Sequence, residues 1–165
     1  MTTRPLLKWP DARLRTAVPE VPEITDEVRQ IWDDMIDTMD AMPGVGLAAP
    51  QIGVMLQLAV VDASDDRTRR IRMANPQIID ASAMMNSHEE ASPNLPGVFA
   101  AVKRPRCVTV RFMDENGMYV RRDLVGLEAT SVQHQIDHLQ GKMFFDRLSK
   151  VKRDMLLKRA KKVKT

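Results

Sequence analysis

The sequence predicts an α+β fold, in which amphipathic helices and antiparallel strands share one core. Residues 25–42 and 126–140 both repeat apolar side chains at the spacing of a helix. Residues 107–125 show β-branched alternation on both sides of an Asn-Gly pair, which is typical of a hairpin. No internal repeat or shift in composition divides the chain, so we expect a single domain over residues 1–165.

The first helix is expected over residues 25–42, where apolar side chains recur at i, i+3, i+4 and i+7. Thr25 offers a side-chain oxygen that caps the first backbone amides. Pro43 and Gly44 end the pattern and open a glycine-spaced segment over 44–53. Its small residues let the backbone approach another group closely, so this segment is a candidate for ligand contact.

Strands are expected at 56–63 and 71–76, because two β-leaning runs enclose a polar loop. A second hairpin is expected over 107–125, with its turn at Asn116-Gly117. Residues 77–99 carry no pattern that decides between strand and loop. The strands therefore pair antiparallel, and part of the sheet stays unassigned.

The second helix is expected over about 126–140, where Gly141 stands at the position that commonly ends a helix. A third, basic helix is expected over about 149–163. Residues 142–165 hold ten Lys or Arg against two Asp, a net charge of +8, whereas the rest of the chain is −5. Such a segment attracts phosphate backbones or anionic surfaces, although a charged terminal helix is more often only solvated.

The composition is that of a globular protein, with 44% hydrophobic and 28% charged residues. No apolar run approaches the roughly 18 residues that cross a bilayer, and the N-terminal segment lacks the continuous apolar region of a secretory signal. One cysteine, Cys107, excludes an intrachain disulfide and fits a reducing compartment. We therefore expect a cytoplasmic protein in which Cys107 is a small buried strand residue.

His134 and His138 stand four residues apart on the second helix, so their rings project from one face and can share a metal. This pair alone is a weak signal, because histidines at this spacing often only pack or face solvent. In metal hydrolases the residue after the first histidine is normally a glutamate that transfers protons. Here it is Gln135, whose neutral amide cannot act as a base.

Three segments, in this order and at these distances, resemble the peptide deformylase family: GVGLAAPQ at 44–51, EASPNLP at 90–96 and QHQIDHLQG at 133–141. The resemblance extends from about residue 7 to the C-terminal helix. It implies the peptide deformylase-like fold, with antiparallel sheets around a central helix that carries the His-x-x-x-His motif, plus N-terminal and C-terminal helices.

The resemblance also implies a reaction, removal of the formyl group from the N-terminal formyl-methionine of nascent chains with Fe²⁺ or Zn²⁺. His134 and His138 match the two histidine ligands, Ser92 stands in place of the cysteine ligand, and Gln135 stands in place of the catalytic glutamate. A serine hydroxyl is hard and rarely deprotonated, so we expect weaker metal binding and doubtful occupancy.

Other family roles map onto further residues. The Leu47 backbone amide and the Gln51 side chain match the groups that stabilise the developing oxyanion. Glu90 and Arg104 match an acidic and a basic residue that pair behind the metal, although a surface ion pair is nearly as plausible an interpretation. The substrate pocket is expected from residues matching the family's lining: Gly44, Val45, Gly46, Leu95, Leu127, Thr130 and Ser131.

Three observations change the expected substrate. Thr130 and Ser131 are polar where the family has an apolar pocket, and Phe99 stands where an arginine anchors the substrate backbone. His88 is near Ser92 in sequence, but we interpret it as a solvent-facing loop residue rather than a replacement ligand. Formyl-methionyl peptide is therefore not assured as the preferred ligand.

The sequence thus predicts a deformylase-like, metal-dependent amide hydrolase of low or no activity that binds the N-terminal peptide of nascent chains. The alternative is a non-catalytic peptide- or ribosome-binding module. It would use the retained groove and the basic C-terminal helix, which contacts the ribosome in the family. Turnover that a chelator abolishes would favour the enzyme, and salt-sensitive association without turnover would favour the module.

Overall fold

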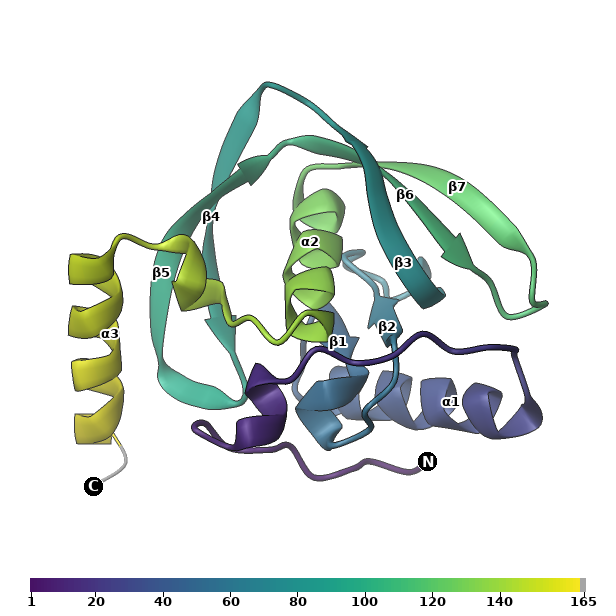
Figure 1. Ribbon diagram of the computed structural model, residues 1–165, viewed down its shortest axis with the longest axis horizontal. Coiled ribbons are helices and arrows are strands. Elements are labelled where there is room, and N and C mark those ends of the chain that lie inside the picture. Colours follow the sequence, from purple (N-terminus) through teal and green to yellow (C-terminus); the bar gives the residue numbers. More distant parts are fainter. Residues whose placement is uncertain (164–165) are drawn as a thin grey trace.

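The computed structural model describes residues 1–163 of the chain. The strands pair into two antiparallel groups (Figure 1): a five-stranded sheet in the order β1-β2-β3-β6-β7 and a separate hairpin, β4-β5. The helices are α1 (Asp26–Ala41), α2 (Leu127–Leu139) and α3 (Lys150–Val163), with short 3-10 turns η1 (Ala12–Arg15), η2 (Ala49–Ile52) and η3 (Phe144–Arg147). The strands are β1 (Gly46–Ala48), β2 (Leu58–Val61), β3 (Ile71–Ala81), β4 (Met85–Ser92), β5 (Leu95–Pro105), β6 (Cys107–Met113) and β7 (Tyr119–Val125).

Helix α2 lies in the middle of the molecule, with the hairpin β4-β5 on one side and the larger sheet on the other (Figure 1). Its apolar side packs on the sheet through Val132 and Ile136. The helix ends where expected, because Gly141 adopts the left-handed conformation with φ of 77°. The α+β class predicted from the sequence is confirmed, and the histidine-bearing helix is its central element.

Helix α1 begins after Thr25, whose side-chain oxygen accepts a hydrogen bond from the Val28 amide at 3.2 Å. Its predicted apolar stripe is buried, with Trp32, Met35 and Met39 completely inaccessible. The stripe packs against β1 and β2 in one hydrophobic cluster. This packing fixes the segment after α1, which carries the glycine-spaced motif.

The segment 77–99, unassigned from the sequence, is almost entirely strand: β3 continues to Ala81, and β4 and the start of β5 follow. The hairpins expected from 56–76 and 107–125 are both present as antiparallel pairs. One expectation was wrong, because Cys107 is exposed. It starts β6 opposite the exposed Val125, while Val108, the next residue, points inward.

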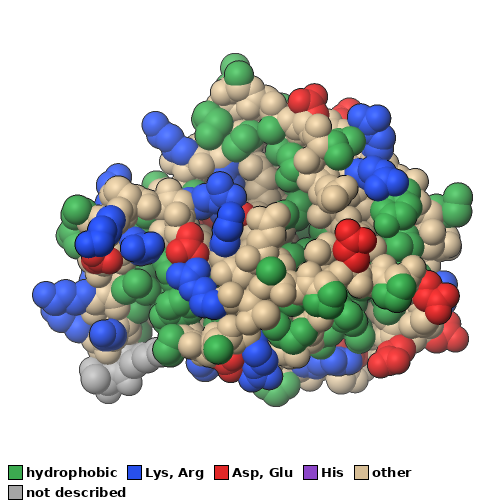
Figure 2. All heavy atoms as spheres, in the orientation of Figure 1, with side chains coloured by type: hydrophobic (Ala, Val, Ile, Leu, Met, Phe, Trp, Pro, Cys, Tyr) green, Lys and Arg blue, Asp and Glu red, His purple; other side chains and the backbone are tan. Residues whose placement is uncertain are grey.

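Helix α3 packs on β5 through the buried residues Leu156 and Ala160. Lys and Arg side chains gather over α3 at one edge of the molecule (Figure 2). Its basic residues are mostly exposed, so the positive charge is presented to solvent. Among residues 1–163, no helix combines the length and the apolar character needed to span a membrane.

Candidate active site

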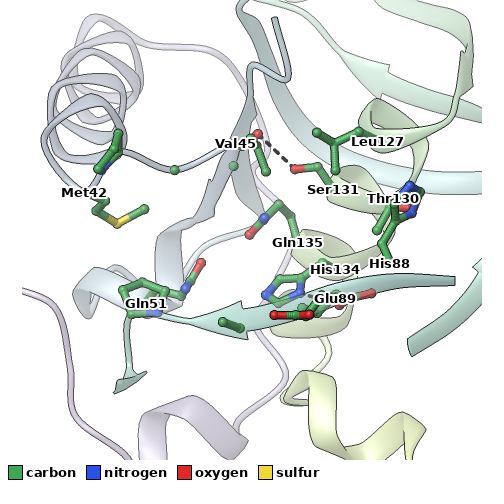
Figure 3. Close-up of a pocket in the computed structure, with 16 residues that line it drawn as sticks. Met42, Val45, Gln51, His88, Glu89, Leu127, Thr130, Ser131, His134 and Gln135 are labelled. Carbon is green, nitrogen blue, oxygen red and sulfur yellow. Dashed lines mark hydrogen bonds and ion pairs between the residues drawn. The ribbon is translucent and has the colours of Figure 1, made fainter. Parts of the chain in front are cut away.

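A pocket of about 250 Å³ opens where the glycine-spaced segment, strand β4 and helix α2 meet (Figure 3). Helix α2 supplies its floor, β4 one wall, and the turn after α1 the other. The pocket therefore collects residues from all three segments that carry the family resemblance. Its lining consists of Met42, Pro43, Gly44, Val45, Gly46, Gln51, His88, Glu89, Glu90, Ala91, Pro93, Leu127, Thr130, Ser131, His134 and Gln135.

His134 and His138 face each other on α2, with their Nε2 atoms 3.1 Å apart and their ring centroids 4.9 Å apart. His134 Nδ1 lies 2.8 Å from Oε1 of Glu90. A carboxylate only accepts, so Nδ1 of His134 carries the proton and, in the neutral ring, Nε2 offers its lone pair. The pair thus directs one nitrogen of each ring to a common point.

His138 is buried, and its pKa lies well below the usual value because burial, and then the neighbouring His134 and Arg104, disfavour the imidazolium. The ring is therefore neutral and carries a single proton, on either Nδ1 or Nε2. On Nε2 that proton donates to Nε2 of His134 and leaves the buried Nδ1 without a partner. A proton thus satisfies the contact between the two rings.

A buried ion-pair network holds this arrangement from behind. Arg104 donates to both carboxylate oxygens of Glu90, at 2.7 and 3.0 Å, and to Asp137 of α2 at 2.9 Å. Arg104 is only 2% exposed, so it is not a surface pair. Burial acts to raise the pKa of Glu90, but hydrogen bonds from His134 and Arg104 outweigh it and lower that pKa. The ionised Glu90 therefore ties β4 to the histidine pair.

Gln135 lies beside the pair with its amide directed into the pocket (Figure 3). The side chain is buried, and its Oε1 has no hydrogen-bond partner. A Cβ atom on Gly46 would stand 2.5 Å from the Gln135 Nε2. The glycine at 46 is therefore what leaves room for this amide, which explains one small residue of the motif.

Ser92 and Gln51 both turn to Asn94, which is completely buried. The Ser92 hydroxyl donates to Oδ1 of Asn94 at 3.2 Å and accepts from the Asn94 backbone amide at 3.3 Å. Gln51 donates to the same Oδ1 at 2.7 Å, and its own Oε1 accepts from the Ala48 amide. Asn94 thus engages the hydroxyl that the sequence predicts in place of the cysteine ligand.

The interpretation of His88 as a solvent-facing loop residue was wrong. This residue belongs to β4 rather than to a loop, is partly buried, and lines the pocket. Its Nδ1 shares a hydrogen bond of 2.8 Å with Oγ1 of Thr130. The period-two spacing of His88, Glu90 and Ser92 is the signal that places all three on one face of a strand.

Of the remaining residues singled out in the sequence, some line the pocket and others lie outside it. Ser131 lines the pocket, and its hydroxyl donates to the Val45 carbonyl at 2.9 Å, so it is already engaged. Leu95 is instead 1% exposed in the cluster beneath α3 and does not line the pocket. Phe99 is exposed on β5 outside the pocket, and Leu47 is a buried residue of β1. Sequence position alone therefore overestimated the lining at Leu95.

These side chains fit a divalent metal only in part. Two convergent imidazoles, one held by a carboxylate, are typical of a transition-metal site. The sequence predicts Ser92 as the third donor, but its hydroxyl is neutral and its proton is directed at Asn94. No group of three or more His, Cys, Asp or Glu within residues 1–163 is arranged to hold a metal ion. The donor set therefore matches weak rather than tight binding.

The class of protein defined by the fold and the pocket is an α+β fold built around a central helix, which bears two histidines at the spacing of a metal site and brings His134 to the pocket floor. The family model described as polypeptide deformylase matches residues 3–154. The chain belongs to the polypeptide deformylase family. This family is metal-dependent and acts on the N-termini of nascent polypeptides.

Relatives and solved structures agree with this assignment. A peptide deformylase of Rhodopseudomonas palustris is 40% identical over 98% of this chain and 95% of the relative, and one of Hydrogenovibrio crunogenus is 41% identical over 95% and 92%. The crystal structure of a peptide deformylase from Legionella pneumophila superposes with a TM-score of 0.92 at 39% identity, covering 99% and 96% of the two chains. The crystal structure of the peptide deformylase from Ehrlichia chaffeensis in complex with actinonin superposes with a TM-score of 0.91 at 33% sequence identity, covering 98% of each chain.

Proposed function

We propose that the protein binds the N-terminal residues of a peptide in this pocket and hydrolyses an N-formyl group slowly or not at all. The observation that carries the proposal is the side chain of Gln135, a buried, neutral amide directed into the pocket directly after the first histidine. An amide cannot take a proton from water near neutral pH. Loss of a general base typically lowers the rate by about 10²- to 10⁴-fold.

Fe²⁺ or Zn²⁺ would be held by His134 and His138, with Ser92 as a poor third donor. A bound metal would supply a polarised water for attack on the formyl carbon. The chain's own groups would do the rest: Glu90 orients His134, while the Leu47 amide and the Gln51 side chain stabilise negative charge on the formyl oxygen. Gln51 already donates to Asn94, which leaves one amide hydrogen for that role.

The proposal is tested by a deformylation assay on formyl-Met-Ala-Ser with supplied metal, using the wild type and the double variant Ser92→Cys, Gln135→Glu. The wild type is expected to be at least about 10²-fold slower than the double variant, because the variant restores both the thiolate and the base. Equal rates would contradict the proposal. Continued inactivity of the folded variant would move the cause to the polar pocket around Thr130.

A ribosome- or polyanion-docking role is the second candidate, supported by the exposed basic surface of α3. Its charge is separate from the pocket, so docking and peptide binding are independent properties. Binding to ribosomes should weaken steeply with salt, since it replaces counterions. Charge reversal at Lys158 and Lys162 should abolish it, and reversal of the similarly exposed Arg121 should leave it unchanged.

A further inference from the structure

The Gln135 amide offers an acceptor at the floor of the pocket. The residue is 4% exposed, and its buried Oε1 has no hydrogen-bond partner. Leaving a buried acceptor unsatisfied costs roughly 1–3 kcal/mol. The pocket therefore favours a ligand that brings an N–H group to this point.

The charges around the pocket favour a cation. None of its lining residues, all within the described part of the chain, is Lys or Arg. Glu90 is neutralised by Arg104, but Glu89, an exposed residue that lines the same pocket, has a side chain that makes no hydrogen bond or ion pair within residues 1–163. A neutral formamide gains little from an unpaired carboxylate, whereas an ammonium group gains a charge-assisted partner.

A tightly bound divalent metal would oppose this preference by repelling a positive ligand. In this chain the donor at Ser92 is a hydroxyl engaged by Asn94, so a metal competes only weakly with a positively charged ligand for the pocket. Gln135 and Ser92, the two residues to which the proposed loss of turnover is assigned, thus leave a pocket rich in hydrogen-bond acceptors. A primary ammonium has three N–H donors, and the pocket lining contains two acceptors without a partner among residues 1–163: the buried amide oxygen of Gln135 and the exposed carboxylate of Glu89.

We propose that the pocket binds a peptide with a free α-ammonium N-terminus in preference to the N-formylated peptide of the same sequence. This proposal rests on the proposed function, namely binding of a peptide N-terminus in this pocket. The protein would then recognise the product of formamide hydrolysis, which another enzyme of that reaction class must supply. It would act as a reader of processed N-termini rather than as their processing enzyme.

Isothermal titration with three forms of Met-Ala-Ser amide tests the proposal: the free amine, the N-formyl and the N-acetyl peptide. The free amine is expected to bind about tenfold tighter than either blocked form, as a charge-assisted hydrogen bond of about 1.5 kcal/mol requires. Formyl binding that is equal or tighter would overturn this inference and leave the proposed function standing. Binding of none of the three at millimolar concentration would overturn both.

Two variants locate the preference. Glu89→Gln keeps the shape of an exposed side chain and should weaken binding of the free amine several-fold while leaving the formyl peptide unchanged. Gln135→Leu should reduce the same preference by removal of the buried acceptor. Glu115→Gln, which removes an exposed carboxylate in the β6–β7 turn, is the matched control and should change neither affinity. An unchanged preference in both pocket variants would contradict the assignment.

Discussion

The Nε2 atoms of His134 and His138 lie 3.1 Å apart, close enough to share a proton as well as a metal. The tautomer of His134 is fixed by Glu90, and the neutral His138 can donate the shared proton. The packing of the two rings is therefore satisfied without a cation.

Chelation should hardly change the stability of the wild type, because weak metal binding adds little free energy to the folded state. We expect the unfolding temperature in excess EDTA to match that with added Zn²⁺ within about 2 °C, since 1 kcal/mol shifts a domain of this size by about 2–4 °C or slightly more. Differential scanning calorimetry of both samples measures the difference. A loss of 10 °C on chelation would show that the metal is a structural part of the fold.

Arg104→Met should destabilise the protein by about 3–5 kcal/mol, because it leaves the buried carboxylates of Glu90 and Asp137 without their shared cation. Urea unfolding gives the free energy directly. Arg111→Met is the control, as Arg111 is exposed on β6 over the Tyr119 ring and should cost about 1 kcal/mol or less. A small effect at Arg104 would mean that water replaces the guanidinium.

His88→Leu combined with Thr130→Val should shift the pocket toward apolar side chains. Each substitution removes one partner of the 2.8 Å hydrogen bond in the pocket wall, so the pair is changed together. Peptides that begin with norleucine should bind about tenfold tighter to the double variant, and peptides that begin with serine should not gain. An unaltered ranking of the two peptides would show that the side chain of the first residue lies elsewhere.

The helices could be predicted from the sequence, whereas strand β4 in the pocket wall could not. Helices α1 and α2 were predicted within a residue at each end, because their apolar stripes face the core and their ends carry Thr25 and Gly141. Strand β4 was not, because its inward positions hold the polar residues His88, Glu90 and Ser92, which obscure the usual alternation of apolar and polar side chains. The convergence of β4 with α2 is a long-range contact that no local pattern contains.

Some site residues could be located from the sequence motifs, whereas others depend on the fold. The motifs located Gln51, His134 and Gln135, and the structure brings all three to one pocket. Leu95 does not line the pocket, because a tight turn follows Ser92 and the chain then enters the hydrophobic cluster beneath α3. The hydrogen bonds of Asn94 also depend on the fold, since they join Leu7, Gln51 and Ser92 from three segments.

The ion pair between Arg4 and Asp34 should make stability depend on acid. Burial acts to raise the pKa of Asp34, but hydrogen bonds from Arg4 and Gln30 outweigh it, and the pKa is lowered. A carboxyl group whose pKa is lower in the folded state stabilises the fold fully at pH values above its pKa in the unfolded state, about 3.9. This stabilisation is lost as the pH falls through the folded-state pKa. Asp34→Asn should therefore cost about 1 kcal/mol at pH 7 and less near pH 3, as urea unfolding at both pH values would show. An equal cost at both would assign the effect to packing.

The central claim, that the centre has lost its tight hold on metal, is tested most directly by the Zn²⁺ dissociation constant. Competition with a chromogenic chelator measures it for the wild type and for Ser92→Cys under the same conditions. We predict at least about hundredfold tighter binding by the cysteine variant, because it restores a soft, charged third donor to the histidine pair. Equal affinities would contradict the account and show that His134 and His138, with the hydroxyl of Ser92, already form a competent metal site.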